Sequence, residues 1–121
     1  FMRSKDVSKV FLIGASMGGT ASLKVASREE VAGVVTLSAP WAIDGLDARE
    51  DVTAISAPKL FIAAREDLFH ARSVDFFDQT AQQPREHQIV DGNAHGTQLL
   101  FGNSGPRVQG LIVAFLRKYT E

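Results

Sequence analysis

The sequence predicts an α/β fold, a three-layer sandwich in which a four-stranded parallel sheet with right-handed helical crossovers lies between layers of helices. Two observations support this prediction. Apolar runs typical of strands buried on both faces alternate along the chain with segments that favour helix. The last of these segments repeats its apolar residues at helical spacing, as a helix covering a sheet does. Such alternation is typical of parallel strands joined by helices.

The first third of the chain is predicted to hold two strands and one helix. The run KVFLI, Lys9–Ile13, is nearly continuous in apolar residues and predicts a buried strand. The residues of Gly18–Ser27 are small or favour helix. A second apolar run, Val31–Ala39, predicts the next strand, which Pro40 closes.

The middle of the chain is predicted to hold a loop, a short helix and the third strand. In the stretch Asp44–Pro58, a loop followed by a short helix is expected. Asp47 and Glu50 have the spacing of a capping box for that helix. The run KLFIAA, Lys59–Ala64, predicts a buried strand.

The last third is predicted to hold two helices and the fourth strand. The segment Ala71–Gln82 has the pattern of an amphipathic helix, and His87–Val90 predicts a strand. A closing helix follows, in which Pro106 occupies a first-turn position that tolerates proline. Its apolar residues recur at steps of three and four: Val108, Leu111, Ile112, Phe115, Leu116 and Tyr119.

Length and composition limit the possible functions. With 121 residues, the chain is expected to form one domain, residues 1–121. The formal net charge of −1 does not support nucleic acid or an anionic membrane as a partner. The absence of cysteine excludes disulfides, thiolate metal sites and a cysteine nucleophile. No signal peptide or membrane-crossing run is visible, which favours a cytoplasmic location. Phe1 before Met2 indicates a vector remnant or a piece of a longer chain.

In open parallel sheets, ligand sites form in the loops beyond the carboxyl ends of the strands. The predicted strands place four segments at that edge of the sheet. They are Gly14–Gly19, Ala39–Gly45, Arg65–His70 and Asp91–Thr97.

The segment GASMGG fits the G-x-S-x-G nucleophile elbow, with Gly14, Ser16 and Gly18 at the required spacing. Such a turn pushes the serine hydroxyl outward, and the two glycines are expected to leave room for the close backbone. The following helix favours negative charge at its amino end, and the N–H of Met17 is expected to donate to an oxyanion. The alternatives are a tight turn with a solvated serine and a phosphate-binding loop, which the lack of a following lysine disfavours.

A serine nucleophile needs a base, and the chain has three histidines. His95 follows the fourth strand and is flanked by glycines, so its loop can carry the imidazole toward Ser16. His87 is expected to be an ordinary strand residue. His70 begins a predicted helix and is expected to cap it or to lie on its surface. His95 is the predicted base, and the alternative is a surface loop histidine.

The base needs a carboxylate to orient it. Asp67 and Glu66 both follow the third strand, and because neighbouring side chains point in different directions, one of them is expected to serve. Asp67 is preferred, with solvated turn carboxylates as the alternative reading. Asp91 and Asp44 also lie near the strand ends and are less suitable.

These residues occur in the order Ser, Asp, His, which is the order of the α/β-hydrolase fold. The chain resembles the carboxyl-terminal half of an α/β-hydrolase, in the dienelactone-hydrolase-like or small serine esterase branch. The resemblance implies Ser16 as nucleophile, His95 as base, Asp67 as acid and the Met17 N–H as an oxyanion donor, with no metal or organic cofactor. Dienelactone hydrolases proper use cysteine at the position of Ser16. The matching segments are VFLIGASMGG, VVTLSAP, APKLFIAAREDLF, IVDGNAHGTQLL and GLIVAFLRKY.

The chain departs from the family by lacking the strands that precede the elbow. That region normally supplies a second oxyanion donor, whose loss costs on the order of 3 kcal/mol in the transition state. The elbow strand is expected to become an exposed sheet edge, and a bare apolar edge invites association. A homodimer or a complementing chain at this edge is therefore expected.

The segment between the second and third strands is too short for a lid domain, so an open site for short-chain, soluble esters is expected. Trp41, Leu68 and Phe69 are candidate substrate-binding residues, with ordinary packing at the rim as the alternative. The predicted function is a serine carboxylic-ester hydrolase. The alternatives are a catalytically weak fragment that serves as an interaction domain, and acyl transfer or peptide cleavage by the same residues.

Overall fold

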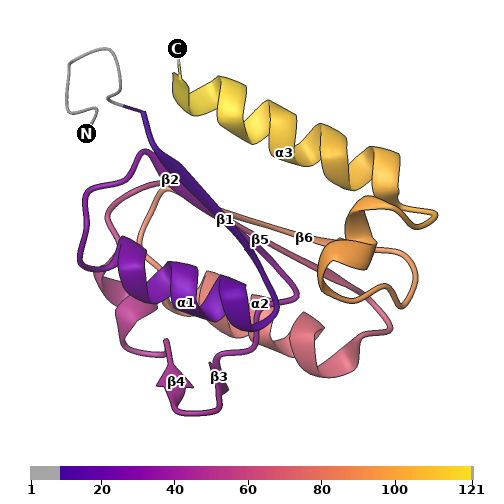
Figure 1. The fold of residues 1–121 in the computed structure, drawn as a ribbon, viewed down its shortest axis with the longest axis horizontal. Helices are drawn as coiled ribbons and strands as arrows, with labels where there is room; N and C mark the ends of the chain where they lie inside the picture. The colour runs from indigo at the N-terminus through magenta and orange to yellow at the C-terminus, as the bar shows by residue number, and fades with distance from the viewer. Residues whose placement is uncertain (1–8, 121) are drawn as a thin grey trace.

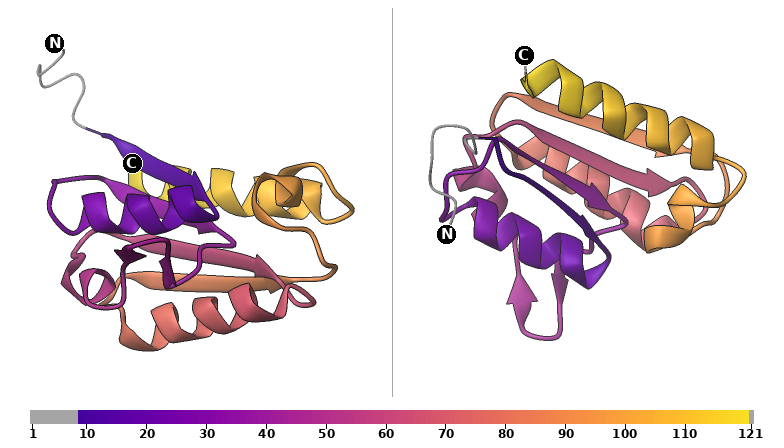
Figure 2. Two further views of the ribbon diagram at one scale, coloured as in Figure 1. Left: turned by 60° about the horizontal axis from the view of Figure 1, so that its bottom comes forward. Right: turned by 45° about the horizontal axis from the view of Figure 1, so that its top comes forward.

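The computed structural model describes residues 9–120. A four-stranded parallel sheet forms its middle layer, in the order β1 (Phe11–Ala15), β2 (Gly33–Leu37), β5 (Lys59–Ala64) and β6 (Arg85–Val90). Helices α1 (Met17–Ala26) and α2 (Leu68–Thr80) cover one face, and α3 (Gly105–Thr120) covers the other (Figures 1 and 2). The predicted α/β fold and its three layers are confirmed.

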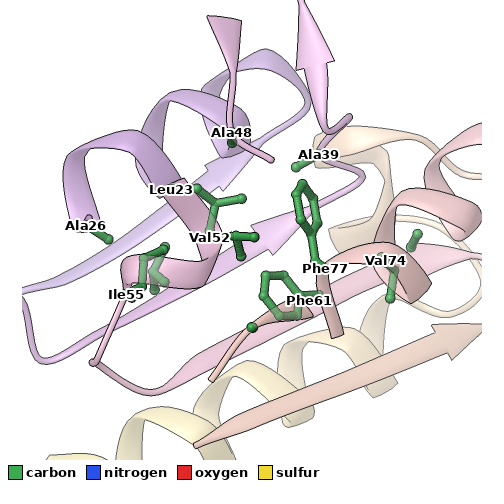
Figure 3. Packing of buried hydrophobic residues seen from close by; sticks show 12 residues of the cluster. Leu23, Ala26, Ala39, Ala48, Val52, Ile55, Phe61, Val74 and Phe77 are labelled. Atoms are coloured by element: carbon green, nitrogen blue, oxygen red, sulfur yellow. The ribbon is translucent and has the colours of Figure 1, made fainter. Parts of the chain in front are cut away.

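Each face of the sheet has its own apolar core. Beneath α1 and α2, one core cluster combines buried side chains of both helices with side chains of β2 and β5, and in it the Phe61 and Phe77 rings stack with centroids 5.3 Å apart (Figure 3). Beneath α3, Val108, Ile112 and Phe115 are buried against the opposite face. The odd and even residues of β2 and β5 therefore enter different cores, which explains why these strands are apolar throughout.

Several element ends differ from the sequence prediction. The first strand begins at Phe11 and not at Lys9, and it runs on to Ala15. The second strand is shorter than predicted, because Ser38 turns the chain with a φ of 55°. The fourth strand begins at Arg85, which pairs with Lys59 of β5. Where a strand begins and ends depends on its pairing with the neighbouring strand, and the local sequence does not encode that pairing.

Two helix ends also differ. Helix α1 begins at Met17 and ends at Ala26, one residue earlier at each end than predicted. Helix α2 begins at Leu68 and ends at Thr80, and it therefore starts immediately after the Asp67 position. The closing helix is confirmed as α3, with Pro106 in its first turn.

The segment after β2 differs most from prediction. It holds a small hairpin of β3 (Ala42–Ile43) and β4 (Leu46–Asp47) before a 3₁₀ helix, η2 (Asp51–Ala54). The predicted capping box is wrong. Asp47 lies in β4 and its carboxylate binds Arg49, while Glu50 at the N-cap of η2 makes no side-chain cap bond.

Strand β1 forms one edge of the sheet. Within residues 9–120, its only strand neighbour is β2. Ile13 of β1 is 49% exposed and Val10, just before it, is 46% exposed. This edge therefore presents unpaired backbone groups together with apolar side chains.

Candidate active site

Ser16 lies in a sharp turn between β1 and α1. Its backbone has φ 52° and ψ −125°, a conformation that non-glycine residues rarely adopt. The amide of Ser16 donates to Leu37 O at 2.8 Å, and its own carbonyl accepts from Gly19 N at 2.9 Å and Thr20 N at 3.2 Å. These bonds to strand β2 and to the first turn of α1 hold the strained turn in place.

The glycines around Ser16 have unequal importance. A Cβ on Gly14 would lie 2.4 Å from Gly18 O and 2.5 Å from Ser22 Oγ, so the prediction for this position agrees with the packing. A Cβ on Gly18 would meet nothing within 4 Å, so the need for space predicted there is wrong. Gly19 is the second tight position, because its Cβ would lie 2.8 Å from that of Ala39. A side chain at Gly19 would therefore push α1 away from the segment that follows β2.

His95 lies in the loop between β6 and a 3₁₀ helix, η3 (Gly96–Leu100). Its Nε2 is 3.1 Å from Ser16 Oγ, and its Nδ1 is 2.8 Å from Asp67 Oδ2. The His95 side chain is 42% exposed, so one side of the imidazole faces solvent. The side chains of Ser16, His95 and Asp67 come from three segments that lie far apart in the sequence. They form one continuous path of hydrogen bonds.

Ser38 holds the loop that carries His95. Its hydroxyl accepts a hydrogen bond from Gly96 N at 2.9 Å, and its own amide donates to Ile62 O at 2.8 Å. Ser38 is fully buried, and Gly96 has a φ of 62°. Sequence reasoning did not find Ser38, because a serine after a strand carries no local sign that a distant loop binds it.

Asp67 is the N-cap residue of α2 and follows β5. Its Oδ2 accepts from His95 Nδ1, and its Oδ1 accepts from His70 Nδ1, each at 2.8 Å. Burial raises the pKa of Asp67, but the hydrogen bonds from His70 and His95 outweigh it and hold the pKa below its usual range. The carboxylate is therefore ionised and acts as a double acceptor.

The other carboxylates weighed from the sequence lie elsewhere. Asp91 is 3.4 Å from Arg65 at an exposed position. Asp44 occupies the β3–β4 turn with a φ of 47°. Glu66 is exposed, and its backbone N–H donates to Gly92 O. Among these candidates, only Asp67 hydrogen-bonds His95.

The remaining histidines have different surroundings. His87 lies in β6, as predicted, and its Nδ1 is 3.1 Å from Asp78 Oδ2. His70 lies in the first turn of α2, where it does not cap the helix but binds the carboxylate of Asp67. Its ring centroid is 4.5 Å from that of His95. His70 therefore belongs to the same cluster as Ser16, which the sequence did not indicate.

Of the three candidate substrate-binding residues, Trp41 packs against other aromatic rings, whereas Leu68 and Phe69 are exposed. The Trp41 ring packs edge to face between Phe69 and Phe76, at 5.4 Å and 5.3 Å between centroids. Leu68 is 65% exposed and Phe69 is 46% exposed. Trp41 thus rests on the core, and the apolar surface beside it comes from the start of α2.

Comparison with known proteins identifies the family. Residues 2–121 match the PET hydrolase-like family over nearly the whole chain. The chain belongs to the PET hydrolase-like family. A comparison with curated proteins finds no match.

Solved structures share the fold of this PET hydrolase-like chain. A dienelactone hydrolase from Anabaena variabilis superimposes with a TM-score of 0.82 at 23% identity, over 98% of this chain and 54% of that one. An esterase domain from Rhodothermus marinus gives 0.76 at 22% identity, over 93% and 62%. A monoacylglycerol lipase from Paleococcus ferrophilus gives 0.80 at 15% identity, over 93% and 70%. Together with the family match, this shared fold confirms the predicted resemblance to α/β-hydrolases. The chain spans 54–70% of the length of these three structures.

The site of this PET hydrolase-like chain also places potential metal ligands together. Asp67, His70 and His95 each offer a ligand atom, and these atoms lie within 4.8 Å of one another. The Nδ1 atoms of both histidines already pair with the Asp67 carboxylate by hydrogen bonds. Within residues 9–120, none of the helices has the length and apolarity that a membrane crossing needs.

Proposed function

We propose that this PET hydrolase-like chain is a serine carboxylic-ester hydrolase in which Ser16 is the nucleophile, His95 the general base and Asp67 the orienting acid. The observation that supports the proposal most is the unbroken hydrogen-bonded path from the Ser16 hydroxyl to the Asp67 carboxylate. Its two links are 3.1 Å and 2.8 Å long, within the range that proton transfer and orientation need.

The reaction would proceed through an acyl-enzyme. Ser16 Oγ attacks the ester carbonyl carbon while His95 Nε2 takes the hydroxyl proton. The tetrahedral intermediate collapses, the bond to the alcohol oxygen breaks, and His95 returns the proton to the departing alcohol. Water then attacks the acyl-enzyme with the same proton transfers, which releases the carboxylic acid and restores Ser16. Asp67 stabilises the imidazolium in both halves of the cycle.

The oxyanion of each tetrahedral intermediate needs hydrogen-bond donors. Met17 is the first residue of α1, so its N–H is free of the helix ladder and lies at the positive end of the helix dipole. We assign Met17 N–H as one donor. With this donor alone, turnover would be slower by about a hundredfold than with two, because each is worth about 3 kcal/mol.

The apolar surface beside the cluster favours small, soluble esters as substrates. Phe69 and Leu68 expose apolar area at the start of α2, directly after Asp67. The Trp41 ring packs edge to face against the Phe69 ring. An acyl or alcohol group would bury part of this surface at about 25 cal/mol per Å². Acyl transfer and peptide cleavage by the same residues are alternatives, which a screen of esters, amides and added alcohols separates.

A fluorophosphonate probe tests the proposal directly. We expect the probe to form its covalent bond at Ser16, as read by mass spectrometry of the digested protein. Ser16→Ala should abolish labelling and lower kcat/KM for p-nitrophenyl acetate by about a thousandfold or more. Ser56→Ala, at an exposed loop serine, is the matched control and should leave both unchanged. Labelling at another residue, or full activity in Ser16→Ala, contradicts the assignment.

A second candidate function is self-association, and the β1 edge supports it. Unpaired backbone groups of β1 and the exposed Ile13 and Val10 side chains would be covered by the same edge of a second copy. Ile13→Lys should then shift the protein from dimer to monomer in light scattering. Val113→Lys changes a similarly exposed apolar side chain on α3 and should leave the dimer intact. A wild-type chain that is monomeric at micromolar concentration contradicts this candidate.

A further inference from the structure

We propose that His70 is a positioning residue that holds the Asp67 carboxylate toward His95 and prevents it from capping its own helix. The inference rests on the proposed function, because it concerns how the acid of that site is oriented.

The first observation is that the two oxygens of the Asp67 carboxylate accept from different histidines. Oδ2 of Asp67 accepts from His95 Nδ1, and Oδ1 accepts from His70 Nδ1, both at 2.8 Å. Within residues 9–120, no other donor hydrogen-bonds this carboxylate. The Asp67 side chain is only 16% exposed, so water is a limited substitute for either imidazole. In the part of the chain that the structure describes, His70 is therefore the only group that fixes the oxygen facing away from His95.

The second observation is that Asp67 occupies the N-cap position of α2 without capping it. An N-cap aspartate ordinarily accepts from the amides two or three positions later, here Phe69 and His70. The Asp67 side chain makes no such bond, and its backbone has φ −88° and ψ 73°. The helix amides and the imidazole of His95 thus compete for one carboxylate. A cap is worth about 1 kcal/mol, so the competing position is a real alternative.

The third observation is that His70 is itself held. Its side chain is 18% exposed. The Phe69 ring meets its imidazole edge to face at 5.2 Å, and the His95 ring lies 4.5 Å away. The donor is therefore pre-oriented by packing, and the Asp67 carboxylate is held between two imidazoles.

Loss of the His70 donor should release the carboxylate. Oδ1 would be left without a partner at a largely buried position, and rotation of the side chain toward the α2 amides would supply one. His95 would then lose the bond that orients its ring. This change affects proton transfer more than substrate binding, and the new cap offsets much of the lost stability.

The experiment compares His70→Ala with His70→Asn, since the Asn side chain places an amide donor close to the position of the imidazole Nδ1–H. We expect His70→Ala to lower kcat by about tenfold to a hundredfold, the cost of misplacing a reacting group by about 1 Å, with KM within about twofold. His70→Asn should restore most of kcat. The low-field proton resonance of His95 Nδ1–H should shift or disappear in His70→Ala and persist in His70→Asn.

The matched control is His87→Ala, which removes another histidine–aspartate contact, the 3.1 Å pair with Asp78. Within residues 9–120, neither member of this pair hydrogen-bonds Ser16, Asp67 or His95. His87→Ala should leave kcat and the His95 resonance unchanged. The inference is overturned if His70→Ala changes neither kcat nor the His95 resonance. It is also overturned if His70→Asn fails to restore kcat and both His70 variants show the same fall in unfolding temperature, because His70 would then have only a structural role. If wild-type Ser16 takes no fluorophosphonate, the proposed function fails separately, and the resonance still tests the His70 contact.

Discussion

The strained backbone of Ser16 leads to a prediction about stability. Its φ of 52° with ψ −125° costs a non-glycine residue about 1–3 kcal/mol, and glycine adopts the same conformation without that strain. Ser16→Gly should remove this cost, whereas Ser16→Ala keeps the Cβ and therefore the strain. Both variants lose the hydroxyl and its 3.1 Å contact with His95, so that loss cancels in the comparison.

The magnitude follows from two opposing effects. Relief of strain stabilises Ser16→Gly by about 2 kcal/mol, and the extra freedom of glycine in the unfolded chain costs about 1 kcal/mol. Ser16→Gly should therefore be more stable than Ser16→Ala by about 1 kcal/mol. For a domain of this size, that difference raises the unfolding temperature by about 4 °C. Neither variant should hydrolyse esters, so this difference in stability should appear between two equally inactive proteins.

The assay is thermal and urea unfolding of both variants, with Ser56 as the reference position. Ser56 is exposed and is not among the residues with positive φ, so Ser56→Gly should be less stable than Ser56→Ala by about 0.5–1 kcal/mol. The reasoning is refuted if Ser16→Gly is no more stable than Ser16→Ala while the Ser56 pair behaves as expected. The turn would then be unstrained, and the serine would fit it as well as glycine.

Three further predictions concern a buried lysine, an ion pair and the turn that holds Ser16. Lys59 is fully buried, and its Nζ donates to the carbonyls of residues 57, 82 and 84 at 2.6, 2.9 and 3.1 Å. Lys59→Met leaves these carbonyls without the ammonium donor and should lower the free energy of unfolding in urea by about 2–4 kcal/mol. An unchanged urea midpoint contradicts this prediction. The hydrogen bond from Lys24 lowers the pKa of Asp51, so the pair stabilises the fold above about pH 4 and is lost at lower pH. Asp51→Asn should cost about 0.5–1 kcal/mol at pH 7 and less at pH 2, and an equal cost at both refutes the pairing. Gly14→Ala should prevent fluorophosphonate labelling by distorting the turn against Gly18 O, and normal labelling shows that the backbone accommodates the methyl group.

The sequence predicts the fold well where the signal is local. The apolar runs of β1, β2 and β5 and the spacing in α3 are local patterns, and each of these elements is present close to its predicted place. The ends are less accurate, because β6 extends to Arg85 by pairing with Lys59, and β2 stops where Ser38 turns. The β3–β4 hairpin was missed, since its strands are only two residues long and lack an alternating pattern.

The sequence by itself determined which side chains are the chemical candidates: Ser16 in its glycine-rich turn, and Asp67 and His95 after later strands. It could do so because parallel strands bring their carboxyl ends to one edge of the sheet. Only the tertiary structure decided that Gly19 and not Gly18 is the tight glycine, that Ser38 binds the His95 loop, and that His70 shares the Asp67 carboxylate. The physical reason is that these contacts depend on how closely helix, strand and loop pack and on the direction in which each side chain points, and no local pattern of residues encodes either.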